Sequence, residues 1–400
     1  MSRHYRLLSE AKLRNKNVLL RAGFDLPMEK GKVTDISRVL AIKKTMQHIL
    51  DAGAVLIIMA HQGRPKDTPD PSFSQKPIVS VLKKVLKTRV HFASDCVGPE
   101  AVSAIAKAKP GEVVLLENLR FHPEEKKNDP AFAKKLASLA DVYVNDAFTN
   151  CHRDHASMVG VPKLLPSFMG FALADDVKYL GMVLHKTKHP LTLIVAGSKM
   201  ETKVPVIERF LTVGDHILVG GCIANTLIAA RGFDVGSSKY DEKGLELAQE
   251  LMLESQKKKR AEIVVPRDAV VASELSEKAV KIDLPVEDIV GDMSIFDIGK
   301  VTLKRYIEIV ESSKMIVWNG PLGVYEYNRF SHATKRIAEA IVRATKRGAI
   351  SIIGGGDTID FHLKYKYSLR PYTYVSMGGG AMLEFISGKH FTSLKVLEKR

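Results

Sequence analysis

The sequence predicts an α/β protein with parallel sheets covered by helices. Short apolar runs rich in Val, Ile and Leu alternate with amphipathic segments of helix length, which is the pattern of parallel α/β structure. The runs are continuously apolar rather than alternating, so helices should cover both faces of each sheet. With 400 residues, of which 45% are hydrophobic and 26% charged, the chain is long enough for roughly two or three domains.

The composition argues against several classes of protein. No apolar run approaches the ~18 residues that cross a membrane, and the N-terminal stretch lacks the apolar core of a secretory signal. Cys96, Cys151 and Cys222 form no CxxC pair, which predicts a reducing, cytoplasmic location without a zinc site or disulfide framework. Cys222, in a glycine-rich turn, is also considered as a reactive thiol. The formal charge of +15 suggests an anionic ligand, but no aromatic or zinc-finger signature points to specific nucleic-acid binding.

In the first half of the chain, charged side chains follow the apolar runs. Ligands of open α/β sheets bind beyond the carboxyl ends of the strands, and clustered cations repel one another unless an anion is nearby. A single arginine there could be a solvated charge, but several predict a phosphate or carboxylate site, because the guanidinium fork bonds oxyanions in pairs. The residues that follow these runs are Arg21, His61, Arg64, Arg120, Asn145, Asp146, His152, Arg153 and His155.

In the second half, the apolar runs end in glycine, which lets the backbone approach a ligand closely. Gly197 precedes Lys199 and Lys203, which are spaced i,i+4 at an expected helix start and indicate either an anion site or two solvated lysines. In GGGDT, Asp357 is either a helix N-cap or a carboxylate beside a metal. The sequence has no GxxxxGK[ST] motif, so a nucleotide site would not be a Walker P-loop.

The stretch between the halves has a helical pattern. Met169, Leu173, Val177, Leu180 and Leu184 recur at helical spacing, and a helix here could run from one domain to the other. One cationic domain and one glycine-rich domain suggest two ligands that are brought together by closure.

At these residues the sequence resembles the phosphoglycerate kinase family along essentially its whole length. The matching motifs, in order, are RAGFDLP, HQGRPK, LLENLRFHPEE, DVYVNDAF…HRDHAS, GSKMETK, VWNGPLGVYE, GGGDT and SMGGGAMLEF. The resemblance implies two similar-sized, Rossmann-like α/β domains joined by a helical hinge. The expected ranges are 1–168 for phosphoglycerate binding, 169–186 for the hinge helix, 187–375 for nucleotide binding and 376–400 for a segment that returns to the first domain.

The resemblance also implies a reaction and its residues. The expected reaction is reversible phosphoryl transfer between 1,3-bisphosphoglycerate with Mg-ADP and 3-phosphoglycerate with Mg-ATP, by a cytoplasmic monomer. Arg38 and Lys199 would face the transferred phosphoryl group together with Lys203, and Asp357 would face Mg²⁺. The phosphoglycerate site would comprise positions 23 and 25 with Arg38, His61, Arg64, Arg120 and Arg153. The nucleotide site would comprise Gly197, Lys203, Gly220, Asn319, Pro321, Glu326, Gly355, Gly356, Asp357 and Thr358.

The sequence departs from the family pattern in the first motif. Gly23 and Asp25 stand where the family has Asp and Asn, so position 23 offers no side chain and position 25 offers an acceptor instead of an amide. Thr149 and Met377 also differ, replacing Gly and Thr. We expect retained phosphoglycerate kinase activity, with Asp25 taking over a contact to the substrate hydroxyl. The alternative is an impaired or substrate-shifted homologue, or one that only binds nucleotide. A Rossmann dehydrogenase is disfavoured because no GxGxxG follows the first run.

Overall fold

The computed structural model describes residues 5–66 and 69–399. Residues 1–4, 67, 68 and 400 fall within the predicted domain ranges but lie outside the described residues. The chain divides into two compact units, which are Met1–Lys178 with His390–Arg400 (unit 1) and Tyr179–Lys389 (unit 2). Among the described residues, no helix has both the length and the apolarity needed to cross a membrane.

Unit 1 contains a six-stranded parallel sheet in the order β5-β6-β4-β1-β7-β8. The central strands are apolar and fully covered, as their continuous Val, Ile and Leu runs predict. A separate antiparallel ribbon joins β2 to β3. The strands are β1 (Asn17–Ala22), β2 (Met28–Glu29), β3 (Lys32–Val33), β4 (Val55–Met59), β5 (Val90–Phe92), β6 (Val113–Leu115), β7 (Val142–Asp146) and β8 (Ser167–Met169).

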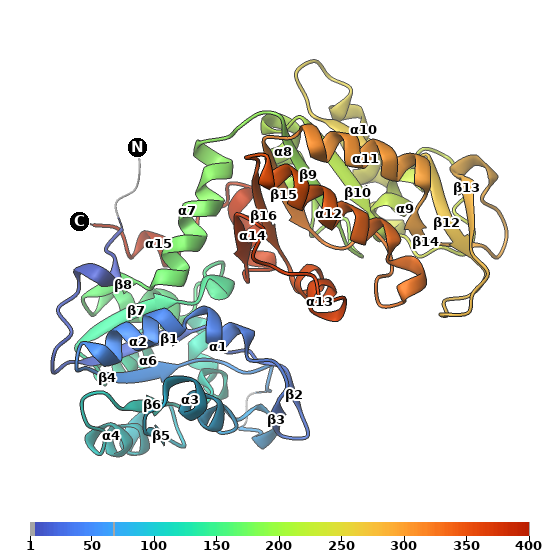
Figure 1. The fold of residues 1–400 in the computed structure, drawn as a ribbon. Coiled ribbons are helices and arrows are strands. Elements are labelled where there is room, and N and C mark those ends of the chain that lie inside the picture. The colour runs from blue at the N-terminus through green and yellow to red at the C-terminus, as the bar shows by residue number, and fades with distance from the viewer. Residues whose placement is uncertain (1–4, 67–68, 400) are drawn as a thin grey trace. The chain divides into compact units, whose positions relative to one another are not determined.

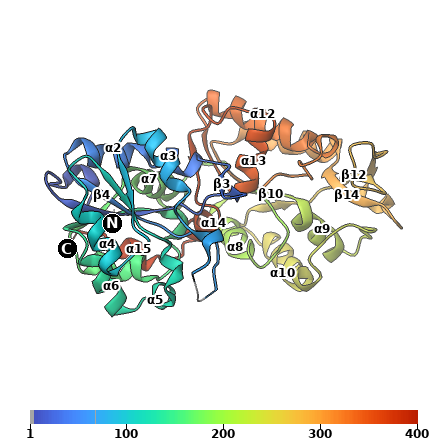
Figure 2. The same ribbon diagram turned by 90° about the horizontal axis from the view of Figure 1, so that it is seen from below.

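Helices lie on both sides of the unit 1 sheet, with α2 and α3 on one side and α5 and α6 on the other (Figure 2). Their apolar residues recur every three or four positions, as Ile78, Leu82 and Leu86 do along the buried side of α3. The helices are α1 (Ser37–Ala41), α2 (Lys43–Asp51), α3 (Ile78–Leu86), α4 (Gly98–Ala106), α5 (Pro123–Lys127), α6 (Pro130–Ala137) and α15 (Thr392–Lys395). The turns that matter for the site are the 3-10 turns η3 (Leu119–Phe121) and η4 (Phe148–Asn150) and the π-turn η5 (Ala156–Gly160).

Unit 2 contains a second six-stranded parallel sheet, in the order β11-β10-β9-β15-β16-β17. Helices α12 and α13 lie on one side of it, and α8, α9 and α10 on the other (Figure 2). The strands are β9 (Leu191–Ala196), β10 (His216–Gly220), β11 (Glu262–Val264), β15 (Met315–Asn319), β16 (Ile350–Gly354) and β17 (Tyr374–Ser376). The helices are α8 (Val204–Val213), α9 (Gly221–Ala230), α10 (Leu245–Ser255), α11 (Lys300–Ser312), α12 (His332–Lys346), α13 (Gly356–Lys364) and α14 (Gly380–Ile386).

Unit 2 also holds a small antiparallel sheet that the sequence reading did not predict. It is built from β12 (Asp268–Ala272), β13 (Ile282–Pro285) and β14 (Ser294–Ile298), with β12 in the middle. The outer strand β13 is mostly exposed, with a burial pattern that lacks a continuous apolar run. Such a strand carries no strong periodic signal.

A single helix, α7 (Phe171–His185), spans the division between the units (Figure 1). The bounds of α7 lie within the range 169–186 that the sequence predicts for a hinge helix. The C-terminal part of the chain that belongs to unit 1 begins at His390, later than the predicted 376, because β17 pairs with β16 and α14 packs on α8 in unit 2. Ser393 Oγ donates to the carbonyl of Cys151 over 2.6 Å, which ties this segment to unit 1.

Candidate active site

The carboxyl ends of β1, β4 and β7 lie side by side in the middle of the unit 1 sheet. Arg21 of β1 is opposite Met59 of β4 on one side and Asn145 of β7 on the other. The residues just beyond these strands therefore meet at one edge, where the ligands of parallel sheets bind. This is the edge at which the sequence predicts an anion site.

Arg21 is fully buried and faces the interior of unit 1. Its Nε donates to Ser157 Oγ over 2.9 Å, and Ser157 in turn donates to the buried carboxylate of Glu125 over 2.6 Å. Burial lowers the pKa of Arg21, and the charge of Glu125 opposes that shift. The prediction that Arg21 belongs to a ligand-facing cationic cluster is therefore wrong, because its charge is balanced inside the protein.

His61 is a neutral hydrogen-bond donor at this edge. Its Nδ1 lies 3.1 Å from Arg21 Nη2, and because a guanidinium only donates, Nδ1 must accept and the ring proton sits on Nε2. Nε2 lies 3.6 Å from Asp25 Oδ2. Burial, with the charges of Arg21 and Arg120, lowers the pKa of His61 to about 3. His61 is thus not a cation at neutral pH, although the sequence placed it among cations.

Asp25 is held at the same edge by the loop that follows β4. Its Oδ1 accepts from the backbone N–H of Gly63 over 2.8 Å, and its backbone carbonyl accepts from Arg38. Burial would raise the pKa of Asp25, but the nearby Nε2–H of His61, the hydrogen bond from Gly63 and the charge of Arg38 hold the pKa well below its usual range. The carboxylate is therefore ionised, and its side chain is 41% exposed.

Three further arginines lie around Asp25 and His61. Arg120, on η3, is buried and donates from Nη1 to the carbonyl of Gly63 over 2.6 Å. Burial and the charges of Arg153 and Arg21 lower the pKa of Arg120 to about 10. Within the described part of the chain, Arg120 Nε has no hydrogen-bond partner. Arg38 is half-buried, and Arg64 is exposed on the loop after β4. This arrangement leaves uncompensated positive charge that suits an oxyanion.

Asn145 and Asp146, which end β7, do not face this edge. Both are buried. Asn145 Oδ1 accepts from the backbone N–H of Ala147 over 3.0 Å, and Asp146 Oδ1 accepts from the N–H of Leu173 over 2.7 Å. Asp146 thus binds the first turn of α7, where a carboxylate satisfies free N–H groups. Their predicted part in the strand-end cluster is corrected to support of η4 and α7.

In unit 2, Lys203 and Asn319 form the polar centre of the glycine-rich edge. Lys203 Nζ donates to Asn319 Oδ1 over 2.9 Å, and Asn319 Nδ2 donates to the carbonyl of Gly354 over 2.9 Å. Burial lowers the pKa of Lys203 to about 8, while the charge of Asp357 opposes that shift. An ammonium group fixed in this way is ready to receive an anion.

Two glycines let the backbone approach this pair. A Cβ at Gly355, whose φ is +103°, would lie 2.7 Å from Asn319 Nδ2, and a Cβ at Gly197 would lie 3.0 Å from Lys203 Cε. The N–H of Gly320 donates to Thr358 Oγ1 over 2.8 Å, which fixes the start of α13 against the end of β15. Larger residues would fill the space beside Lys203, so the glycines keep open a cradle in which backbone and ammonium groups could meet a phosphate.

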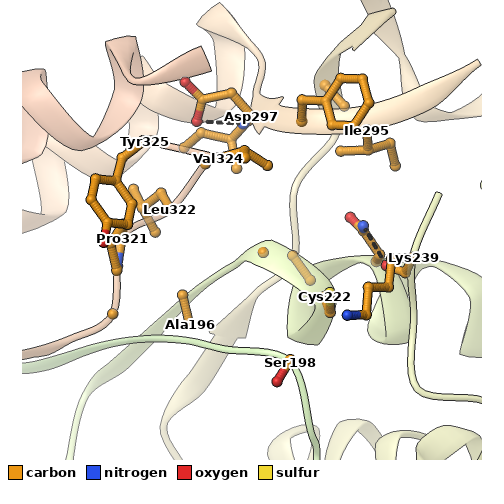
Figure 3. Close-up of a pocket in the computed structure, with 18 of the residues that line it drawn as sticks. Ala196, Ser198, Cys222, Lys239, Ile295, Asp297, Pro321, Leu322, Val324 and Tyr325 are labelled. Carbon is orange, nitrogen blue, oxygen red and sulfur yellow. Dashed lines mark hydrogen bonds between the residues drawn. The ribbon is translucent and has the colours of Figure 1, made fainter. Parts of the chain in front are cut away.

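Next to this cradle lies a cavity of about 450 Å³. The segment with Pro321, Leu322, Val324 and Tyr325 forms one wall, and the start of α9 with Cys222 forms the opposite wall (Figure 3). Of the predicted nucleotide residues, Gly197, Pro321, Glu326 and Asp357 line the cavity. Gly220 lies behind it, where a Cβ would meet Leu322 Cδ2 at 2.6 Å. A largely apolar slot of this volume suits a flat aromatic base.

Lys199 and Lys203 do not share the start of a helix. α8 begins at Val204, with Lys203 as its N-cap and Pro205 in its first turn, and Lys199 lies exposed in the loop before it. Proline favours the first turn of a helix, which explains this later start. The predicted i,i+4 geometry of the two lysines is therefore wrong.

Asp357 lies in the first turn of α13, and the N-cap of that helix is Gly355. The N-cap interpretation of Asp357 is therefore wrong. Its exposed carboxylate is close enough to Lys203 to influence the pKa of the lysine. A single hard oxygen ligand beside a phosphate cradle fits Mg²⁺, which proteins often bind through one or two carboxylates and the phosphates of a nucleotide.

The sequence reading missed several residues of the cavity. Asp297 lines it, is buried, and accepts from the N–H groups of Ile298 and Ala333. The sequence around Asp297 contains no pattern that distinguishes it from an aspartate exposed to solvent. Cys222, by contrast, is singled out by the sequence as a candidate reactive thiol. It lines the cavity, but burial raises the pKa of its thiol, which disfavours a reactive thiolate.

Unit 1 has a cationic edge, and unit 2 has a glycine-walled cradle with an adjoining cavity. These features are those of a phosphotransferase with two Rossmann-like units. A family model for phosphoglycerate kinase matches residues 8–389. Curated phosphoglycerate kinases of Moorella thermoacetica and Chlorobaculum tepidum are 41% and 40% identical to the chain, covering 98% of it and 99% and 98% of their own lengths. The chain therefore belongs to the phosphoglycerate kinase family.

Solved structures agree with this membership. Phosphoglycerate kinases from Coxiella burnetii and Pyrococcus horikoshii OT3 each superpose with a TM-score of 0.86, at 34% and 31% sequence identity, and cover 98% of both chains. None of these comparisons favours the alternative of a homologue that only binds nucleotide. The chain is an enzyme of the phosphotransferase class.

Proposed function

We propose that the enzyme catalyses the reversible transfer of a phosphoryl group between 1,3-bisphosphoglycerate with ADP and 3-phosphoglycerate with ATP, and that it depends on Mg²⁺. The observation that carries this proposal is the full-length family match, joined to a cationic edge in unit 1 and a lysine cradle in unit 2. Because the cations of both sites are retained, we expect activity although Gly23 and Asp25 differ from the family pattern.

Unit 1 would bind the three-carbon acid. Arg38, Arg64, Arg120 and Arg153 would neutralise its phosphate and carboxylate, and the neutral His61 would donate from Nε2. Arg120 Nε supports this assignment, because a buried guanidinium N–H without a partner is costly unless a ligand accepts from it.

Unit 2 would bind the nucleotide. Gly220 and Pro321 would flank the base, Glu326 would reach the ribose, and Lys203, Asn319 and Gly355–Thr358 would hold the phosphates. Asp357 would bind Mg²⁺, which would neutralise charge on the phosphates. Gly197 would keep the approach to Lys203 open, as its close packing on Lys203 indicates.

The chemistry explains why the site is rich in cations and has no obvious base. In the ATP-consuming direction, a carboxylate oxygen of 3-phosphoglycerate attacks the γ-phosphorus, and the bond from that phosphorus to the bridging oxygen of ADP breaks. A carboxylate is already ionised at neutral pH, so no general base is required. The remaining task is to position the reactants and stabilise negative charge on the transferred group. Arg38, Lys199 and Lys203 would perform it.

A coupled assay tests the proposal. The purified full-length enzyme receives Mg-ATP and 3-phosphoglycerate, and product formation is followed through NADH oxidation. We expect turnover above about 1 s⁻¹, the low end of typical enzyme rates; slower turnover contradicts the proposal. Arg38→Met should lower kcat/KM by about 100-fold or more, since it removes a cation at the site. Arg305→Met, which removes an arginine that is 54% exposed elsewhere in unit 2, should leave kcat/KM unchanged.

The enzyme is further proposed to act as a cytoplasmic monomer on small-molecule substrates. The family resemblance supports this assembly state. Light scattering after size-exclusion chromatography should give the mass of one chain, and a mass of two chains would contradict it.

A further inference from the structure

Gly23 and Thr149 meet at the cationic edge of unit 1. Gly23 follows the last residue of β1, and Thr149 lies on η4 just beyond β7. The two strands are hydrogen-bonded neighbours, with Ala22 opposite Asp146. The two residues are therefore adjacent although 126 positions separate them in the sequence.

Thr149 occupies the space beside Gly23 that a side chain would need. A Cβ built on Gly23 would lie 2.9 Å from Thr149 Oγ1, closer than real Cβ contacts allow. The backbone does not require glycine here, because Gly23 is not among the glycines with positive φ. The reason for glycine at position 23 is thus the threonine that packs against it.

The hydroxyl of Thr149 has acceptor capacity to spare. Its proton is donated to Asn150 Oδ1 over 3.1 Å, and a hydroxyl oxygen retains two lone pairs. The side chain is half-buried rather than sealed off. The other side chains of this edge suit anions, because Arg38, Arg120 and the Nε2–H of His61 only donate. Asp25 is the competing acceptor at this edge, because Oδ1 accepts from Gly63 while Oδ2 lies 3.6 Å from His61 Nε2 and has acceptor capacity left. A ligand O–H group needs an acceptor, and Thr149 Oγ1 is one.

We propose that Thr149 is a specificity-determining residue of the acceptor site, whose Oγ1 accepts a hydrogen bond from the free hydroxyl of a phosphorylated hydroxy acid, and that Gly23 is required to seat it. This inference rests on the proposed function, since it assumes that unit 1 binds the three-carbon acid. Thr149 would distinguish acids with a hydroxyl beside the carboxylate from acids without one.

The test compares 3-phosphoglycerate with 3-phosphooxypropanoate, which lacks only the 2-hydroxyl, as acceptors for the full-length enzyme with Mg-ATP. The readout is the ratio of kcat/KM for the two acceptors. Thr149→Val removes the hydroxyl and should lower this ratio by about 3- to 10-fold, the effect of one neutral hydrogen bond. Thr149→Ser keeps the hydroxyl and should preserve the ratio. The KM for Mg-ATP should stay unchanged in both variants.

The packing is tested separately. Gly23→Ala should lower both Tm and activity, and Gly23→Ala combined with Thr149→Gly should restore Tm but not the acceptor ratio. An unchanged ratio in Thr149→Val, or a ratio lost only in Asp25→Asn, would overturn the role of Thr149. A Gly23→Ala variant as stable as the original would overturn the role of Gly23. Absence of turnover with either acceptor in the unaltered enzyme would instead overturn the proposed function.

Discussion

The guanidinium of Arg21 donates a hydrogen bond to Nδ1 of His61 over 3.1 Å. This single contact fixes where the imidazole proton lies, because Arg21 has no acceptor to offer. The proton must be on Nε2, which points toward Asp25. A fully buried arginine thus determines what His61 presents at the site, as an orienting partner does for many active-site histidines.

His61 should stay neutral across the physiological pH range. Burial and the neighbouring arginines lower the pKa of His61 to about 3, so its NMR signals should not titrate between pH 5 and 8. Its nitrogen shifts should show a protonated Nε2 and an unprotonated Nδ1. His122 is the internal control, because the hydrogen bond that it donates to Asp95 raises its pKa, so it should titrate above the ordinary value. Titration of His61 near pH 6.5 would contradict the proposed tautomer.

Arg21→Met should destabilise the protein strongly. The substitution removes the buried hydrogen bonds from Arg21 to Ser157 and His61 and the positive charge that favours the ionised carboxylate of Glu125. A hydrogen bond that involves a charged group contributes about 1.5–3 kcal/mol to stability. Urea unfolding measures the change. Arg64→Met is the matched control, since Arg64 is exposed at the same site, and it should reduce activity without changing the free energy of unfolding. Equal stability of the two variants would refute a structural role for Arg21.

Lys203 should take up a proton when nucleotide binds. Burial lowers the pKa of Lys203 to about 8, so part of the population is neutral at pH 8, and a phosphate beside it would raise the pKa again. Calorimetric titration with Mg-ADP in buffers of different ionisation enthalpy should report uptake of a fraction of a proton at pH 8 and less at pH 6.5. Lys203→Arg remains charged at both pH values and should abolish the uptake. Uptake that persists in this variant would assign the proton to another group.

Gly355→Ala should impair nucleotide binding and stability together. Its φ of +103° is unfavourable for alanine, and the new Cβ would lie 2.7 Å from Asn319 Nδ2, so we expect a loss of about 1–3 kcal/mol in the free energy of unfolding. The KM for Mg-ATP should rise more than the KM for 3-phosphoglycerate. Gly356→Ala tests the same motif without strain, because a Cβ at Gly356 meets nothing within 4 Å, and its stability should match that of the unaltered enzyme.

The strand-end reasoning predicted the general position of both sites because a parallel sheet gathers the carboxyl ends of its strands at one edge. It failed where the direction of a side chain depends on distant partners. Arg21 turns inward because Ser157 and Glu125 lie beneath it, and no local pattern around residue 21 announces them. Likewise, the start of α8 at Val204 depends on Pro205, which overrides the spacing of the two lysines before it.

Positions 23 and 149, where the sequence departs from the family pattern, are a second case in which the sequence does not reveal a contact between distant residues. In the sequence they are two unrelated substitutions, and only the pairing of β1 with β7 brings them together. Restoring an aspartate at position 23 alone would drive its Cβ against Thr149 Oγ1. Sequence comparison identifies such residues as unusual, whereas the structure identifies them as a pair.

Asp146 should give the stability of the enzyme a pH dependence that can be removed by one substitution. Burial raises the pKa of Asp146 to about 7, against hydrogen bonds from the side chain of Thr45 and from the first turn of α7 that lower it. Between pH 4 and 7 the folded state therefore holds a proton that the unfolded state releases, and the contribution of this group to stability falls as the pH rises. Above pH 7 both states are ionised, and the contribution no longer changes.

Asp146→Asn removes this titration while retaining an oxygen that can accept from the N–H of Leu173. The free energy of unfolding of Asp146→Asn, relative to that of the unaltered enzyme, should therefore increase from pH 5 to pH 8, by on the order of a few kcal/mol. Denaturant unfolding at both pH values measures it. Asp51→Asn, at an exposed aspartate of the same unit, should show a constant difference. A constant difference for Asp146→Asn as well would mean that Asp146 is ionised at pH 5, held so by the N–H groups of α7.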